Sequence, residues 1–385
     1  MIKVGIIGTG NISGAHIGGY LAHGDEARIV ALADIVPGRA AAKAEQTGVE
    51  GVRCYESAAE MLAAEDLDLV SVCTPPDTHA PLVIEALESG VHVLVEKPMA
   101  PSLEECDAMI AAARRSGRML SSIAQNRFRD DMVILKKAVG SGLIGDVVHV
   151  QADSAWWRAL SYYDLDWRGR WDTEGGGCVL NHAIHHIDLL LWLMGSPDRV
   201  QAMLTNAAHE NSEVEDLGVA TMTFGRALAT LTASTVHHGE EQHITVQGRR
   251  ARVSQPWRVV AEQETPSGFP APERDADLTG RLEDIAAAHL PLTHQNHAGQ
   301  IGDVLAAVST GRAPAISGQD GRAGVELVTA IYKAGIEGVA VDLPLSADDP
   351  YYRSGTLSSR APRYYAKTGF LVEAGAGSIV GGSTS

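Results

Sequence analysis

Residues 2–13, which read IKVGIIGTGNIS, decide the fold of the first part of the chain. The apolar run at 2–8 predicts a short buried strand, and residues 12–22 have the apolar spacing of an α-helix. The turn between them, GTGNIS at 8–13, places two glycines and a small residue at the start of that helix. The first glycine permits a tight bend, and the second lets a pyrophosphate approach the backbone at the positive end of the helix dipole. A strand, this turn and a helix together predict a dinucleotide-binding unit.

Asp34 adds a second signal for the same unit. It ends the predicted strand at 27–33, about 20 residues beyond the glycine turn. A carboxylate there accepts hydrogen bonds from the adenosine ribose hydroxyls and repels a 2′-phosphate. Ile35 and Val36 follow it, with no arginine immediately after to bind such a phosphate. The sequence therefore predicts NAD as the cofactor. The alternative, a glycine turn beside an unrelated acid, leaves the agreement of position, spacing and flanking residues unexplained.

Short apolar strands continue to alternate with helical segments up to about residue 125. Such alternation predicts a parallel, doubly wound α/β sheet, and strands that are apolar throughout fit because parallel strands are buried on both faces. The predicted strands are 2–8, 27–33, 52–55, 69–74, 91–95 and 119–124. We expect a Rossmann domain over residues 1–125.

From about residue 145 the pattern changes to strands joined by short turns. The predicted strands are 147–157, 199–207, 217–224, 227–236, 243–247 and 251–256, and the predicted helices are 178–194, 297–309 and 322–335. Consecutive strands with short links predict an antiparallel meander. We expect an α+β domain over residues 126–365 with a large open, mainly antiparallel sheet, and a flexible Gly/Ser-rich tail at 366–385.

The charge balance and the cysteines exclude several classes of protein. The 385 residues include 31 basic and 48 acidic ones, and this net charge of −17 disfavours nucleic acids and anionic membranes as partners. The longest apolar stretch, residues 189–194, is far shorter than the ~20 residues of a membrane span. The four cysteines lie far apart with no C-x-x-C pair. We therefore expect no disulfide framework and a cytoplasmic location.

Further motifs follow along the chain in order. They are TPPDTH at 74–79, EKP at 96–98, GGG at 175–177, GRAP at 311–314, GQDGR at 318–322 and DLP at 342–344. This set, over roughly residues 2–345, resembles the glucose–fructose oxidoreductase, inositol dehydrogenase and MocA family (Gfo/Idh/MocA). The resemblance implies hydride transfer between a nicotinamide and a carbinol carbon, usually of a sugar, inositol or related polyol. It also implies a second domain whose open sheet often forms the oligomer interface, so we expect a homodimer or homotetramer.

Oxidation of an alcohol needs a base for the hydroxyl proton and a cation or donor for the developing alkoxide. The resemblance implies that Lys97 binds the reacting hydroxyl and that His185 acts as the acid/base. Lys97 follows a parallel strand, at the carboxyl edge where such folds bind ligands. The alternative for Lys97 is a surface lysine beside a turn proline. The alternative for His185 is a core histidine whose hydrogen bonds are made within the protein. The three glycines before the helix leave room for a cofactor or sugar and favour catalysis by His185.

Asn181, His185 and Asp188 are spaced to share one face of the predicted helix. The resemblance makes Asn181 a third catalytic candidate, at a point where many members have Asp. An amide carries no charge, which puts a carboxylate mechanism there in doubt, and members with Asn resemble the nucleotide-sugar and ketosugar branch. Asp188 is expected to be structural. Metal binding is not expected, because His182 and Asp188 lie about 120° apart around the helix and no cysteine joins them.

Residues 156–171 hold the densest group of aromatic and cationic side chains. Aromatic faces cover sugar C–H surfaces and arginines bind hydroxyls, carboxylates or phosphates, so this segment is predicted to form the substrate wall. An interface or core role is the alternative, and three arginines at 158, 168 and 170 leave an anionic substrate open. The expected substrate contacts are Arg127, Trp157, Arg158, Tyr163, Arg168, Asn181 and His185. The expected cofactor contacts are Gly8, Gly10, Asn11, Ile12, Asp34, Thr74, Pro75, His79, Glu96, Lys97 and Gln125.

The leading hypothesis is an NAD(H)-dependent oxidoreductase acting on a secondary hydroxyl or ketone of a sugar, inositol or sugar derivative. Two other functions stay open. An NAD-recycling glycosidase or lyase on the same scaffold would cleave its substrate without net formation of NADH. A non-catalytic sensor would bind a dinucleotide and a sugar. The presence of both Lys97 and His185 and the lack of a DNA-binding module disfavour the sensor.

Overall fold

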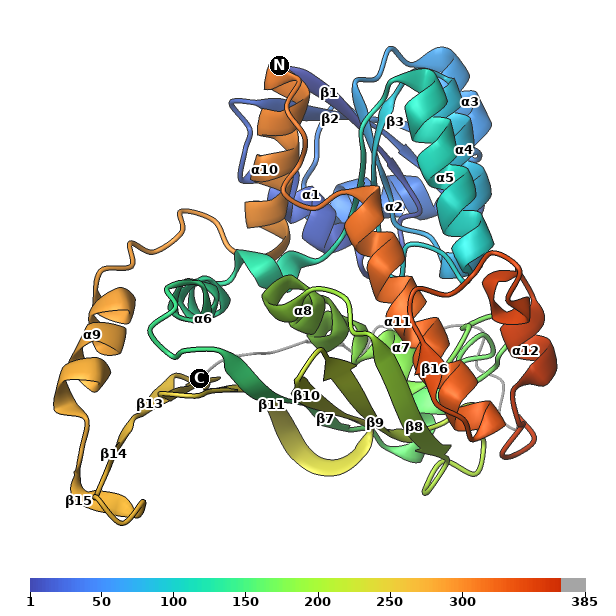
Figure 1. The fold of residues 1–385 in the computed structure, drawn as a ribbon. Coiled ribbons are helices and arrows are strands. Elements are labelled where there is room, and N and C mark those ends of the chain that lie inside the picture. Colours follow the sequence, from blue (N-terminus) through green and yellow to red (C-terminus); the bar gives the residue numbers. More distant parts are fainter. Residues whose placement is uncertain (368–385) are drawn as a thin grey trace.

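The computed structural model describes residues 1–367, which fold around two sheets (Figure 1). The first sheet has six parallel strands in the order β3-β2-β1-β4-β5-β6. They are β1 (Ile2–Ile7), β2 (Ala27–Ala33), β3 (Arg53–Tyr55), β4 (Leu69–Val72), β5 (His92–Val95) and β6 (Leu120–Ser122). The strand order reverses between β1 and β4, where sheets of this kind bind ligands at their carboxyl ends. The predicted parallel, doubly wound sheet is confirmed.

Five helices connect these strands. They are α1 (Ser13–Leu21), α2 (Arg39–Thr47), α3 (Ala58–Ala64), α4 (His79–Glu88) and α5 (Leu103–Ser116). Figure 1 shows α3, α4 and α5 together on one face of the sheet, while α1 lies on the other. Both faces are therefore covered, and this explains why strands such as β4 are buried along their whole length.

The second sheet has eight strands in the order β13-β12-β11-β7-β10-β9-β8-β16. They are β7 (Val147–Trp157), β8 (Arg199–Thr205), β9 (Leu217–Phe224), β10 (Ala227–Ser234), β11 (Val236–Gly248), β12 (Arg252–Gln255), β13 (Arg258–Val260) and β16 (Val341–Asp342). A small two-stranded sheet joins β14 (Glu262–Glu264) to β15 (Pro270–Arg274), and α9 (Ala276–Ala287) follows it. The sheet is mainly antiparallel, as the sequence predicts.

The prediction of a simple meander is wrong at β7. This strand lies between β10 and β11. It pairs in parallel with β10 and antiparallel with β11. The chain passes from β10 to β11 across the end of β7, where the Arg158 N–H donates to the carbonyl of Thr235 at 2.9 Å. The link at 234–236 reads STV and has no glycine, asparagine or proline. Tight hairpin turns need such residues, so the sequence held a signal against a β10–β11 hairpin.

The helix predicted at 178–194 is interrupted. The structure forms α7 (Cys178–Asn181) and α8 (Ile184–Met194), because the Cys178 carbonyl accepts hydrogen bonds from the N–H groups of both His182 and Ala183. The buried carboxylate of Glu215 accepts hydrogen bonds from Gly177 N and Val179 N, each at 3.0 Å, and this fixes the start of α7. Asn181 and His185 therefore belong to two helices with different axes, and the expected shared face does not form.

The remaining helices bind the two sheets together. Helix α6 (Asp130–Gly140) leads toward β7, while α10 (Asn296–Thr310) packs on α1 and buries Ile301 and Leu305 there. Helix α11 (Gly318–Glu337) runs from β6 to β8 (Figure 1). A Cβ at Gly321 would lie 2.6 Å from Ser122 Cβ, and one at Gly335 would lie 2.6 Å from Leu204 Cγ. The glycines of α11 therefore permit close contact with both sheets.

The end of the described chain closes against the second sheet. After β16 the chain forms α12 (Thr356–Arg360), and Lys367 is buried with its ammonium donating to the Tyr163 carbonyl. Residues 368–385, which make up most of the predicted flexible tail, lie outside the described residues. Within residues 1–367, no helix combines the length and the apolar character that a membrane crossing requires.

Two neighbouring glycines of α1 test the packing of α10. A Cβ at Gly19 would lie 2.4 Å from Ile301 Cδ1, whereas one at Gly18 would meet nothing within 4 Å. We expect Gly19→Ala to lower the free energy of unfolding by about 1–3 kcal/mol, because it overpacks this contact. Gly18→Ala should raise it by about 0.5–1 kcal/mol, since alanine is the better helix former. Urea unfolding measures both, and equal effects of the two variants would contradict the close approach of α10 to α1.

Candidate functional site

The glycine turn after β1 has the shape that a pyrophosphate requires. Gly8 has a φ of +87°, and a Cβ there would lie 2.7 Å from Thr74 Cγ2. A Cβ at Gly10 would meet nothing within 4 Å, so the backbone at this point faces open space. Ser13 holds the turn by donating its hydroxyl to Gly10 O at 2.7 Å. With Asn11 and Ile12 exposed at the start of α1, the N–H groups of the turn are accessible to phosphate.

Asp34 lies beside this turn, as predicted. Its Oδ2 accepts hydrogen bonds from Thr9 N at 2.8 Å and Thr9 Oγ1 at 2.9 Å, and its Oδ1 accepts one from Val36 N at 2.9 Å. The carboxylate therefore orders the turn. Sequence reasoning missed Arg39, whose Nη1 lies 3.7 Å from Asp34 Oδ1. Arg39 begins the next helix, so the residues immediately after Asp34 gave no sign of it.

Both ring nitrogens of His79, a predicted cofactor contact, lie against backbone carbonyls. Its ring is fully buried, with Nε2 2.8 Å from Thr74 O and Nδ1 3.0 Å from Pro98 O. Burial lowers the pKa of His79. The ring therefore links the loop of Thr74 and Pro75 to the EKP loop, and its effect on a cofactor passes through those backbones. Gln125, in the 3₁₀ turn η2 (Gln125–Phe128), keeps a buried Oε1 that lacks a hydrogen-bond partner within residues 1–367.

Glu96 is buried at the centre of a hydrogen-bonded cluster. Its Oε1 lies 2.9 Å from His16 Nε2 and 3.3 Å from His297 Nε2, and its Oε2 accepts from Lys97 N at 3.0 Å. Burial alone would raise the pKa of Glu96, but the hydrogen bonds of His16 and His297 hold it well below its usual range. The atoms of His16, Glu96 and His297 that could bind a metal ion lie within 4.8 Å of one another. Hydrogen bonding accounts for that spacing without a cation.

Lys97 reaches from the EKP loop to the start of α7 and α8. Its Nζ lies 3.4 Å from the backbone carbonyl of Asn181, and burial lowers its pKa. The side chain of Asn181 turns the other way, because its amide donates to Gly176 O at 3.0 Å. Asn181 therefore meets Lys97 through its backbone, and its side chain holds the glycine turn in place. The break between α7 and α8 produces this arrangement.

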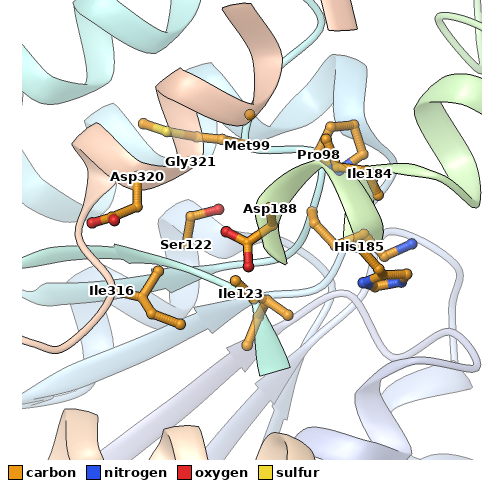
Figure 2. A pocket seen from close by; sticks show the side chains of 13 residues that line it. Pro98, Met99, Ser122, Ile123, Ile184, His185, Asp188, Ile316, Asp320 and Gly321 are labelled. Atoms are coloured by element: carbon orange, nitrogen blue, oxygen red, sulfur yellow. The ribbon is translucent and has the colours of Figure 1, made fainter. Parts of the chain in front are cut away.

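His185 and Lys97 both border a small cavity between β6, α8 and α11. In Figure 2, His185 and Asp320 lie at opposite ends of the view, with Asp188 between them. The cavity holds about 20 Å³, which is room for one water molecule, so a sugar must lie on the open side of these residues. Burial lowers the pKa of His185 well below the imidazole range, and the charge of Lys97 lowers it further. His185 is therefore neutral and able to accept a proton.

Arg127, predicted to contact the substrate, is instead part of a buried ion cluster. Its Nε and Nη2 bind the two carboxylate oxygens of Asp188 at 2.9 and 2.7 Å, and its Nη1 binds Asp320 at 3.1 Å. Burial raises the pKa of Asp188 even with the guanidinium beside it. The cluster joins η2, α8 and α11 directly behind His185. The expected structural role of Asp188 agrees with this geometry, whereas the guanidinium of Arg127 is occupied by protein carboxylates.

The aromatic and cationic segment divides into buried and accessible parts. Tyr163, a predicted substrate contact, is only 1% exposed and packs edge-on against His209, so almost none of its surface is open to a substrate. Trp157 is 46% exposed and stacks on His238. Arg168 lies over the Tyr162 ring at 4.2 Å and forms an ion pair with Glu174 at 3.2 Å. Arg158 also lies over Tyr162, at 5.5 Å.

Comparison with known families agrees with this architecture. Residues 2–123 match the Gfo/Idh/MocA oxidoreductase family with its NAD-binding Rossmann fold, and residues 132–254 match the C-terminal domain of the same family. The chain belongs to the Gfo/Idh/MocA family. The resemblance that its motifs indicate is confirmed, and the protein is an NAD-dependent oxidoreductase.

Individual Gfo/Idh/MocA relatives act on several kinds of compound. Inositol 2-dehydrogenase of Rhizobium meliloti is 28% identical over 339 residues, which cover 86% of this chain and 96% of the relative. D-glucoside 3-dehydrogenase of Escherichia coli is 31% identical over 199 residues, covering 51% and 55%. The crystal structure of the WlbA dehydrogenase from Bordetella pertussis in complex with NADH and UDP-GlcNAcA is 30% identical, with a TM-score of 0.75. That match covers 90% of this chain and 99% of the WlbA chain.

Removal of one charge from the buried cluster tests the role of Arg127. We expect Arg127→Met to lower the free energy of unfolding by about 3–5 kcal/mol, because it leaves Asp188 buried without its partner. The control is Arg115→Met, which breaks an ion pair with Glu88 whose side chains are 61% and 56% exposed. That change should stay within about 1 kcal/mol. If Arg127→Met unfolded in urea like the wild type but raised KM, the guanidinium would be a substrate contact after all.

Proposed function

We propose that the protein oxidises a secondary hydroxyl of a sugar, inositol or sugar derivative to a ketone, with NAD as hydride acceptor, and catalyses the reverse reduction. The observation that carries this proposal is that Lys97 and His185 border the same cavity, at the carboxyl end of β6. Relatives named for inositol and glucoside oxidation, and a solved relative with a bound nucleotide sugar, support the substrate class.

The two side chains divide the work on the hydroxyl. The ammonium of Lys97 donates a hydrogen bond to the substrate oxygen and stabilises the negative charge that develops there. The neutral imidazole of His185 takes the hydroxyl proton. The carbinol carbon then gives up its hydrogen with both bonding electrons, so the products are a ketone, NADH and one proton held by His185. The Asn181 carbonyl, 3.4 Å from Lys97 Nζ, fixes the ammonium in place.

The cofactor, when bound, supplies the acceptor for the hydride. The chain supplies the backbone of Gly8 and Gly10 for the pyrophosphate and the carboxylate of Asp34 for the adenosine ribose. Glu96 binds the Lys97 N–H and so sets the direction of the EKP loop at the nicotinamide end.

Product analysis separates this function from NAD recycling, since a dehydrogenase must form one NADH for each ketone. Glycoside cleavage without net NADH would support the lyase alternative.

The dependence of kcat/KM on pH tests the acid/base assignment. His185 must be neutral to accept a proton, so activity should fall at low pH with a midpoint below the usual imidazole pKa of about 6.5. In Lys97→Met the residual activity should show this midpoint at higher pH, because one positive charge that lowers the pKa of His185 is gone. His185→Asn should lose about 10²–10⁴-fold in kcat and lack this acidic limb.

Lys3→Met is the matched control, since Lys3 pairs with the exposed Asp66 far from the site and should leave kcat and the pH profile unchanged. Binding of NADH, followed by its fluorescence, confirms that each variant still binds the cofactor. An unchanged acidic limb in Lys97→Met, or full turnover in His185→Asn, contradicts the proposed roles.

We propose further that the outer face of the second sheet forms the interface of a homodimer or homotetramer. Met203 and Val219 are register partners on β8 and β9, and with Leu228 on β10 they are 81%, 45% and 55% exposed. Exposed apolar side chains on three adjacent strands of one open sheet face are typical of an interaction surface.

Substitution of Met203 tests this interface. Met203→Asp should convert the wild-type oligomer to a smaller species in light scattering coupled to size-exclusion chromatography, because a buried unpaired carboxylate is costly. Leu290→Asp is the control: Leu290 is 84% exposed but lies in the loop after α9. A monomeric wild type, or loss of the oligomer in the control alone, contradicts the sheet-face interface.

A further inference from the structure

A basic cluster lies beside the proposed catalytic pair. It consists of Trp156, Arg158, Arg168 and His182, gathered around the ring of Tyr162. Arg158 lies over the Trp156 ring at 4.9 Å and over Tyr162 at 5.5 Å, and Arg168 covers Tyr162 at 4.2 Å. The His182 ring packs 5.9 Å from Trp156 and 5.8 Å from Tyr162, measured between ring centroids. Strand β7, the loop after it and the link between α7 and α8 thus bring four nitrogen-bearing side chains to one place.

Three of these side chains have a buried nitrogen without a hydrogen-bond partner in residues 1–367. They are Trp156 Nε1, Arg168 Nε and His182 Nδ1. The first two are donors only, so what they lack is an acceptor. His182 is itself more than nine-tenths buried. A buried donor without an acceptor costs about 1–3 kcal/mol, so Trp156 Nε1 and Arg168 Nε together indicate a place for a ligand that brings acceptor atoms.

The charges around the cluster point in the same direction. Arg158, Arg168 and Lys97 all act to lower the pKa of His182, after burial, which has the largest effect. The acidic side chain in contact is Glu174, which binds Arg168 Nη1 at 3.2 Å and receives the Gly169 N–H. Within residues 1–367 Arg158 forms no ion pair with a carboxylate, and it donates to the Trp157 carbonyl at 2.8 Å. The cluster therefore holds more positive than negative charge.

The geometry of Arg168 selects among anions. Its Nη1 is occupied by Glu174 and the Tyr162 hydroxyl, which leaves the edge of the guanidinium that carries Nε. This edge matches the two oxygens of a carboxylate. His182 directly follows Asn181, whose carbonyl contacts Lys97, so the cluster lies next to the catalytic pair.

We infer that the substrate is a sugar acid, whose carboxylate binds in the basic cluster of Trp156, Arg158, Arg168 and His182 while its ring hydroxyl meets Lys97 and His185. This inference rests on the proposed dehydrogenase function and narrows its substrate class. The carboxylate supplies the acceptor atoms that Trp156 Nε1 and Arg168 Nε lack. The oxidation itself is the one described above, in which the hydroxyl carbon loses a hydride and a proton and the carboxylate is unchanged.

A matched pair of probes tests the inference with the full-length protein. NADH formation is measured with D-glucuronate and D-galacturonate against D-glucose and D-galactose, which differ in the carboxylate alone. We expect kcat/KM at least tenfold higher for the acids. Arg158→Gln should remove this preference mainly through KM, and Trp156→Phe, which deletes one N–H and keeps the ring stack, should reduce it severalfold. Trp257→Phe is the control, because Trp257 Nε1 binds the distant Glu283.

Two further arms keep the inference separate from the dehydrogenase proposal. If no probe yields NADH, quenching of tryptophan fluorescence by D-glucuronate in the presence of NADH still measures binding. Saturation that Arg158→Gln abolishes, with none for D-glucose, then supports the carboxylate site even though the oxidation has failed. Equal use of acids and neutral sugars, a preference that Arg158→Gln leaves intact, or preference for D-glucose 6-phosphate over D-glucuronate would each overturn the inference.

Discussion

The buried carboxylate of Glu96 is the interaction on which the site depends. A lone carboxylate inside a protein costs several kcal/mol, and the chain offsets that cost by placing His16, His297 and the Lys97 N–H around it. These partners come from α1, α10 and the EKP loop, so a single charge ties the glycine-turn helix to a helix almost three hundred residues later. Removing any partner would disturb the loop that carries Lys97.

Further hydrogen bonds beyond His16 extend the same network into the first sheet. His16 Nδ1 lies 3.0 Å from Ser71 Oγ, and that hydroxyl lies 2.7 Å from the hydroxyl of Tyr20. Burial lowers the pKa of His16, so its ring is neutral and holds one proton between Ser71 and Glu96. A second polar network, the Arg127 cluster, holds α8 through Asp188, three residues after His185. The two catalytic candidates are thus each close in sequence to a charged residue held in a polar network.

Local features of the fold and the site could be predicted from sequence, and features that depend on distant partners could not. The glycine turn, Asp34 and the strands of the first sheet follow from short-range spacing. Arg127 was expected at the substrate because its own neighbours say nothing of Asp188 and Asp320, which lie 61 and 193 residues away. The start of α7 depends on Glu215, which comes from a different part of the second domain. The burial of Tyr163 could not be predicted either, because His209, which covers it, is remote in sequence.

The return of α10 to α1 has a consequence for how such a protein changes over evolutionary time. The chain leaves the first sheet after β6, builds the second sheet, and comes back so that Ile301 and Leu305 complete the core around β1. In three dimensions the second sheet, which bears part of the basic cluster, is therefore an insertion within the cofactor-binding half, between β6 and α10. A fragment that stopped at β6 would expose apolar surface of α1. New specificities can therefore arise by exchange of the middle of the chain, while both ends are inherited together.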